Sequence, residues 1–241
     1  MRAISIIYRR ELSAYLRSPI GWITAAVLLL VDGILFQSQA LSGEQLSAIV
    51  LERFFWSTSG VAMAAGILLS IRLIAEERQT HSIVLLNTSP VRDTEVVLGK
   101  FFAALTFLAI MLLLSIYMPL LIKVNGHVTS AQIAVGYLGL IFLGGAALAI
   151  GMFASSLAKQ QLVAGVVGTA ILIVMLLLFQ LSKRIDSPVK EVLEQLDLWW
   201  LHFQNSFMRG VLNLKDIIYY VAVIYFFLLL SVKTLEGKRW Q

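Results

Sequence analysis

The sequence of 241 residues contains no cysteine and only three histidines. The absence of cysteine excludes disulfide bonds and thiolate chemistry. His81, His127 and His202 lie far apart, at spacings that do not suggest a metal site. The chain also lacks a glycine-rich phosphate-binding loop ending in Lys-Ser/Thr and any pairing of a nucleophile with a base. We therefore expect no catalytic residue, metal or cofactor in this chain.

Charged residues are scarce as well, at 14%, whereas 59% of the residues are hydrophobic. Too few polar side chains remain to cover a water-facing surface. About 20 apolar residues in a helix cross the hydrocarbon of a bilayer, and only helices satisfy their own backbone groups there. The sequence predicts an all-α polytopic membrane protein, a single domain over 1–241, whose six spans are 20–36, 54–71, 101–122, 133–153, 162–181 and 217–232.

The net charge of +5 reports topology rather than nucleic-acid binding, because Lys and Arg accumulate on the cytoplasmic side of membrane proteins. Six spans put both termini on one side. That side holds 12 of the Lys and Arg residues and the other side holds 7. We expect both termini in the cytoplasm, and we see no cleavable signal peptide.

Residues 2–17 show helical amphipathicity, with an apolar face opposite a basic one. Ser18-Pro19 interrupts the pattern, because the residue before proline avoids helical angles and proline suits the first turn of a new helix. The segment 1–18 is predicted to be an interfacial elbow helix. The alternative is a plain basic flank that fixes orientation.

The segment 75–95 is too polar to span a membrane, and it separates the second and third spans. Glu76, Glu77 and Arg78 open it, a half-apolar stretch follows, and Ser89-Pro90 offers a helix start. Lys100 follows the segment and is expected to reach the headgroups. A short amphipathic helix here would form a docking surface for a cytosolic partner; a solvated loop is the alternative.

Four further features fall within or beside the spans. Asp32 is an intramembrane carboxylate, a candidate for a pore, for pairing with a neighbouring helix or for an interfacial position. The small residues of 144–151 allow a helix to approach closely, either inside the chain or at a dimer surface or gate.

Segment 42–54 is predicted to be a short interfacial helix outside the membrane. The outer region 182–216 contains an apolar and aromatic face that predicts a second such helix or a partner surface: Val192, Leu193, Leu196, Trp199, Trp200, Phe203 and Phe207.

Three patches of sequence resemble the permeases of type-2 ABC transporters. They are Arg10-Glu-Leu-Ser-Ala-Tyr-Leu-Arg-Ser-Pro19, the stretch from Glu76-Glu-Arg through Ile83-Val-Leu-Leu-Asn-Thr-Ser-Pro90 to Gly99-Lys100, and the ending from Phe203 to Tyr220 with Leu235-Glu-Gly-Lys-Arg-Trp240. The ending is similar to the branch that contains the gliding-motility permease and the permease for nitrous oxide reductase maturation. The family pattern has a Gly-Thr pair and a Glu where this chain has Thr80-His81-Ser82 and Val84.

The resemblance implies a permease of the bacterial inner membrane that exports a substrate or transmits force to a periplasmic or accessory membrane protein. It implies two cytosolic ABC ATPase subunits, which hold ATP and magnesium, and a second copy of the permease or a related one. It also implies a coupling helix that contacts the ATPase through Glu76, Glu77, Arg78, His81, Leu85, Leu86 and Pro90. The competing interpretations are a stand-alone ion-coupled carrier or channel, for which Asp32 is the one intramembrane candidate, and a membrane-embedded enzyme.

Overall fold

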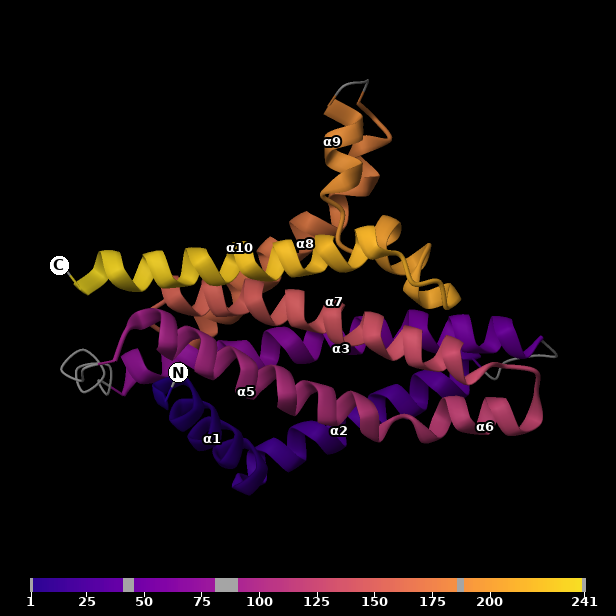
Figure 1. The fold of residues 1–241 in the computed structure, drawn as a ribbon, viewed down its shortest axis with the longest axis horizontal. Coiled ribbons are helices and arrows are strands. Elements are labelled where there is room, and N and C mark those ends of the chain that lie inside the picture. Colours follow the sequence, from indigo (N-terminus) through magenta and orange to yellow (C-terminus); the bar gives the residue numbers. More distant parts are fainter. Residues whose placement is uncertain (1, 41–45, 81–90, 186–188, 240–241) are drawn as a thin grey trace.

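The computed structural model describes residues 2–40, 46–80, 91–185 and 189–239, and in these ranges every regular element is a helix. Six of the described helices are long and apolar enough to cross a membrane, which confirms an all-α polytopic fold. The six candidate spans are Gly21–Gln39, which includes most of α2 (Pro19–Leu35), α3 (Ser47–Gln79), Asp93–Val124, which includes α5 (Asp93–Leu114), α7 (Ser130–Leu157), α8 (Gln161–Ser182), and Leu214–Lys238 of α10 (Leu214–Arg239). Figure 1 shows both termini at one end of the bundle, the end where α3 finishes and α5 begins. We call this end the base.

The amino-terminal helix α1 (Arg2–Arg17) packs against α5 at the base (Figure 1). Tyr15 stacks on Phe107 with ring centroids 5.0 Å apart. Gly99 allows the close approach, because a Cβ at that position would lie 2.9 Å from the side chain of Ile7. Ser18 lies outside both helices, and Pro19 is the first residue of α2. The apolar face of α1 therefore contacts protein.

The centre of the bundle is the packing of α3 on α7. A Cβ on Gly66 would lie 2.6 Å from the carbonyl oxygen of Gly144, so the two backbones touch. Gly151 meets Ser70 of α3, and Gly168 of α8 lies against the Cα of Gly151. Of the two uses expected for the small residues of 144–151, these contacts correspond to packing inside the chain.

One predicted boundary is wrong. Of the outer helix expected over 42–54, residues 42–45 lie outside the described residues, and Ser47–Phe54 form the start of α3, where Phe54 and Phe55 are completely buried in the bundle. The third span, predicted over 101–122, lies within the candidate span Asp93–Val124, which contains two helices. After α5 ends, Ser115 donates a hydrogen bond to the carbonyl of Leu112, and α6 (Tyr117–Asn125) starts with proline in its first turn, where no backbone N–H is needed.

The outer region is also more folded than predicted. Helix α9 (Val189–Gln195) lies beside the end of α8 and stands off the bundle in Figure 1. The chain then turns back, because the Asp197 carboxylate accepts hydrogen bonds from the backbone N–H groups of Trp199 and Leu201. Short helical turns follow at Trp200–Gln204 and Phe207–Arg209. A single interfacial helix over 189–207 is therefore wrong beyond Gln195, and Phe203 and Phe207 are buried in the far end of the bundle.

Candidate functional site

The residues expected to couple to an ATPase lie at the base. Glu76, Glu77 and Arg78 belong to the last turns of α3. His81, Leu85, Leu86 and Pro90 lie outside the described residues, as does the helix start predicted at Ser89-Pro90. On the far side of that gap, α5 begins at Asp93, and the Glu95 carboxylate accepts a hydrogen bond from the N–H of Arg92 at 3.2 Å. The two helix ends flank the segment 80–92.

The three charged side chains at the end of α3 point in different directions. Glu76 pairs with Arg72 one turn earlier in α3, at 2.9 Å. Glu77 reaches Lys100 of α5 at 2.8 Å. Arg78 donates a hydrogen bond to the carbonyl of Ala158, at the end of α7, at 3.3 Å. The end of α3 is thus joined separately to α5 and to α7.

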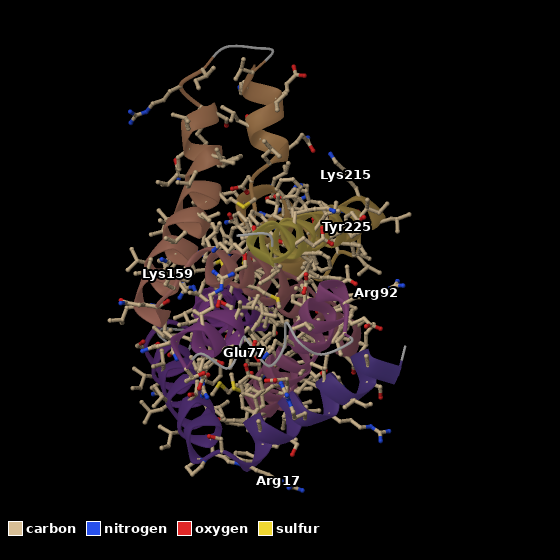
Figure 2. All side chains as sticks on the ribbon, turned by 90° about the vertical axis from the view of Figure 1, so that its left-hand side faces the viewer. Arg17, Glu77, Arg92, Lys159, Lys215 and Tyr225 are labelled. Carbon is tan, nitrogen blue, oxygen red and sulfur yellow. The ribbon has the colours of Figure 1, made fainter. Side chains whose placement is uncertain are left out.

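Lys100 is the centre of an ion-pair cluster that joins three helices. Its Nζ lies 2.8 Å from Glu77 of α3 and 3.1 Å from Glu11 of α1, and its side chain is only 4% exposed. The expectation that Lys100 reaches the headgroups is wrong. Because Gly99 lets α1 press onto α5, Glu11 covers the lysine, and a buried ammonium needs such carboxylates. From the base, Figure 2 shows Glu77 near the middle of the molecule.

Glu11 is held ionised by this cluster. Burial opposes its ionisation, but the charge of Lys100 and the hydrogen bonds from Arg10 and Lys100 outweigh burial and lower the pKa of the carboxyl below its ordinary value of 4.5. Glu11 is not among the residues predicted for the site. It is the one acidic residue before Asp32, on an otherwise basic helix, and this isolation is the signal that could have identified it.

A hydroxyl from α7 bonds to the backbone of α3 near its end. Ser155 Oγ accepts a hydrogen bond from the N–H of Ala75 at 2.9 Å and donates one to the carbonyl of Ile71 at 3.1 Å. Ala75 and Ile71 are four residues apart in α3, which is a continuous helix from Ser47 to Gln79, so one hydroxyl contacts both ends of a helical turn. The last turns of α3 are therefore joined to α7 through Ser155 as well as through Arg78.

The end of α7 is also held by the last helix. Lys238 of α10 donates to the carbonyls of Ser156 and Leu157, at 3.1 and 3.0 Å, next to the Arg78–Ala158 contact. Cations at these unpaired carbonyls suit the negative end of a helix. The base thus contains two sets of contacts, one around Lys100 and one around the end of α7.

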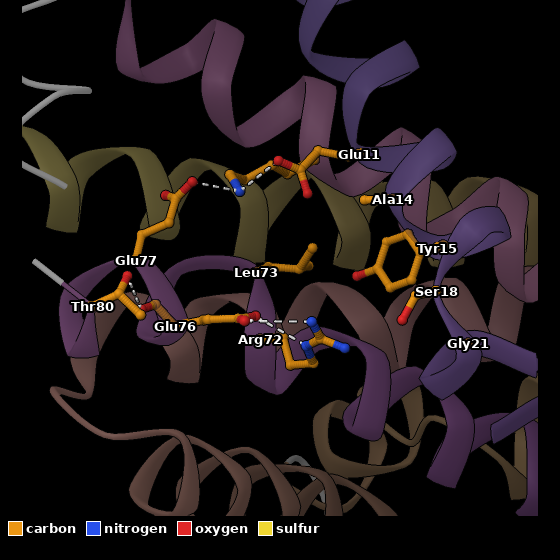
Figure 3. Close-up of a pocket in the computed structure, with 11 residues that line it drawn as sticks. Glu11, Ala14, Tyr15, Ser18, Gly21, Arg72, Leu73, Glu76, Glu77 and Thr80 are labelled. Carbon is orange, nitrogen blue, oxygen red and sulfur yellow. Dashed lines mark hydrogen bonds and ion pairs between the residues drawn. The ribbon is translucent and has the colours of Figure 1, made fainter. Parts of the chain in front are cut away.

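A cavity of about 300 Å³ opens between α1 and α3, beside the Lys100 cluster. Figure 3 shows Glu11 and Tyr15 of α1 on one side and Arg72 and Glu76 of α3 on the other. Lys100 also lines the cavity. Its walls are therefore formed by charges of both signs.

Asp32 lies elsewhere, in the middle of the bundle. Its side chain is buried, and Thr58 Oγ1 of α3 donates a hydrogen bond to it at 2.7 Å. A separate cavity of about 20 Å³ lies beside it, too small for more than a water molecule. In the described ranges no group of three or more His, Cys, Asp and Glu side chains could hold a metal ion.

A buried polar cluster lies at the end of the bundle opposite the base, and the sequence did not predict it. His202 Nδ1 lies 2.7 Å from Asp216 Oδ1, and its Nε2 lies 3.2 Å from the carbonyl oxygen of Gln195. Ser206 donates to the other oxygen of Asp216. The cluster joins the short helical turns to the start of α10, and the sequence spacing gave no sign of it.

The comparison with protein families agrees with this architecture. The model of the family described as "ABC-2 family transporter protein" matches residues 5–215, and the chain belongs to this family. It is a multi-pass permease component of an ABC transporter, and such a component is not itself catalytic. The match concerns the family as a whole and does not single out the gliding-motility branch. No curated protein matches the chain.

Proposed function

We propose that the chain couples ATP hydrolysis by a separate cytosolic subunit to export of a substrate or to force transmission, and that the base is where the two subunits meet. In this proposal two ATP-binding subunits, which hold ATP and magnesium, dock on segment 75–95 of two permeases. The permeases are two copies of this chain or this chain and a relative. The base faces the cytoplasm of a bacterial inner membrane, and a periplasmic or accessory membrane protein receives force in the gliding-like case.

The observation that carries the proposal is the way the two ends flanking segment 80–92 are tied to the bundle. Glu77 and Lys100 link the end of α3 directly to the start of α5 and, through Glu11, to α1. A displacement of segment 80–92 therefore moves three helices together. Because the ion pairs are largely buried, they resist screening by salt and hold the helices as one unit.

The contacts with α7 supply the second half of the mechanism. In this proposal the last turn of α3 tilts about the point where Ser155 of α7 bonds to the backbone of Ala75 and Ile71. Arg78 carries the tilt to the end of α7, which packs against α3 along its length. The contact between the end of α3 and the end of α7 has two arrangements in this proposal, and the nucleotide state of the ATP-binding subunit selects between them. Coupling between distant sites requires such a two-state element.

The absence of cysteine allows a direct test. A single cysteine replaces Val61 of α3, which lines the small cavity beside Asp32. The complex is assembled with its ATP-binding subunit, and the maleimide labelling rate is measured without nucleotide and after vanadate trapping. We expect the rate to change on trapping. Glu77→Gln and Ser155→Ala should abolish the change while ATP hydrolysis continues, because force no longer crosses the base.

Glu236→Gln is the matched control. Glu236 forms an exposed pair with Lys233 on α10, so the same loss of charge should leave the nucleotide response intact. A response that survives both Glu77→Gln and Ser155→Ala, in complexes that assemble normally, would show that coupling does not pass through these contacts.

A further inference from the structure

The residues beside the charged cavity between α1 and α3 are of the kinds found at the membrane–water interface. The elbow residues Ser18 and Gly21 line the cavity, and Trp22 follows directly. The Trp22 ring is 53% exposed, and its Nε1 donates to the carbonyl of Leu16 at 2.7 Å. Exposed tryptophan with a satisfied N–H is typical of the membrane–water interface. Further along α2, Ile23 and Val27 are exposed and apolar, as expected for lipid contact.

An arginine on the α3 wall and a glutamate on the α1 wall have unused hydrogen-bonding capacity. Arg72 binds Glu76 through Nε and Nη2, and within the described part of the chain its Nη1 makes no hydrogen bond. On the facing wall Glu11 uses only Oε1, for Arg10 and Lys100, and among the described residues nothing donates to its Oε2. Glu11 and Arg72 line the same cavity from opposite sides, so one ligand can contact both (Figure 3).

We propose that this cavity binds the headgroup of an aminophospholipid, with the phosphate on Arg72 and the ammonium on Glu11. A guanidinium is a preferred phosphate partner, and an ammonium can donate to a free carboxylate oxygen. The cavity volume of about 300 Å³ suits a group as small as phosphoethanolamine. Glu76 on the Arg72 wall gives the ammonium a second carboxylate.

The same geometry rejects the other common headgroups. Choline has no N–H, so it cannot donate to Glu11 Oε2. Phosphatidylglycerol has a negative charge and no positive one, so Glu11, Glu76 and Glu77 repel it. Specificity therefore depends on a pair of opposite charges held on two helices.

The test measures lipid retention by the isolated chain. The purified full chain is equilibrated with dioleoyl phosphatidylethanolamine, phosphatidylcholine and phosphatidylglycerol in equal amounts, and retained lipids are counted by native mass spectrometry. We expect phosphatidylethanolamine to be retained about ten-fold over either competitor. Arg72→Gln should abolish the preference, while the Lys100 cluster, which does not include Arg72, keeps the fold.

Arg17→Gln is the matched control, since Arg17 lies exposed on α1 next to the elbow and does not line the cavity. This variant should keep the wild-type preference. Glu11→Gln should reduce the preference over phosphatidylcholine in particular, because the amide binds the ammonium less strongly.

Two results would overturn the assignment. Equal retention by Arg72→Gln and Arg17→Gln would show that the lipid binds elsewhere. Displacement of the lipid by soluble glycerophosphoethanolamine at equal concentration would show that the cavity takes a free phosphate ester and that the acyl chains contribute nothing. The measurement needs no ATP-binding subunit, so its outcome is independent of the proposed coupling.

Discussion

Replacing Lys100 by methionine should destabilise the fold far more than removing an ordinary surface lysine. The Lys100 side chain is 4% exposed, and its two partners, Glu11 and Glu77, are 18% and 16% exposed. Without the lysine, two largely buried carboxylates lose their shared partner, and Arg10 lies 2.7 Å from Glu11 and 3.9 Å from Glu77. Breaking a buried pair in this way costs about 3–5 kcal/mol.

The assay is thermal unfolding of the purified chain in a mild detergent. A loss of this size lowers the midpoint by roughly 10 °C for a chain of this length. Combining Lys100→Met with Glu11→Gln and Glu77→Gln removes the stranded charges and should recover most of the loss. Lys233→Met, at the exposed Lys233–Glu236 pair, should not change the midpoint measurably. A Lys100→Met midpoint equal to wild type would refute the argument, because it would mean that water solvates the cluster.

Five other variants test three separate contacts. The pKa of Glu11 in the folded protein lies below its ordinary value of 4.5, so its ion pairs stabilise the fold fully above pH 4.5 and are lost as the pH falls through the folded pKa. The difference in unfolding temperature between wild type and Glu11→Gln should therefore be constant from pH 7 to about 5. It should vanish in stronger acid. Gly66→Ala should cost about 1–3 kcal/mol in unfolding experiments, because its Cβ meets the backbone of α7, whereas Gly60→Ala, with open space around it, should cost nothing. Thr58→Val should cost about 1–3 kcal/mol by removing the hydrogen bond to buried Asp32, and Asp32→Asn, which keeps an acceptor, should unfold close to wild type.

The sequence determined the fold class and the number of spans, because the fraction of hydrophobic residues and the length of each apolar run show which helices must be covered by lipid. It also determined the break at Ser18-Pro19, which is a local property of proline. It located Glu76, Glu77 and Arg78 beside a segment too polar for the membrane. Each of these conclusions rests on neighbours in the chain, and each could be drawn without knowing which helices touch.

Only the tertiary structure decided which side chains pair. Lys100 looked like a residue that reaches the headgroups until Gly99 was seen to bring Glu11 over it, 89 positions away in the sequence. Ser155 lies outside the span predicted over 133–153, yet its hydroxyl bonds to the backbone of Ala75 and Ile71 in another helix. The aromatic residues after Gln195 matched an interfacial helix, but the Asp197 turn folds them into the far end of the bundle. Contacts between helices depend on crossing geometry, which a periodicity along one helix does not contain.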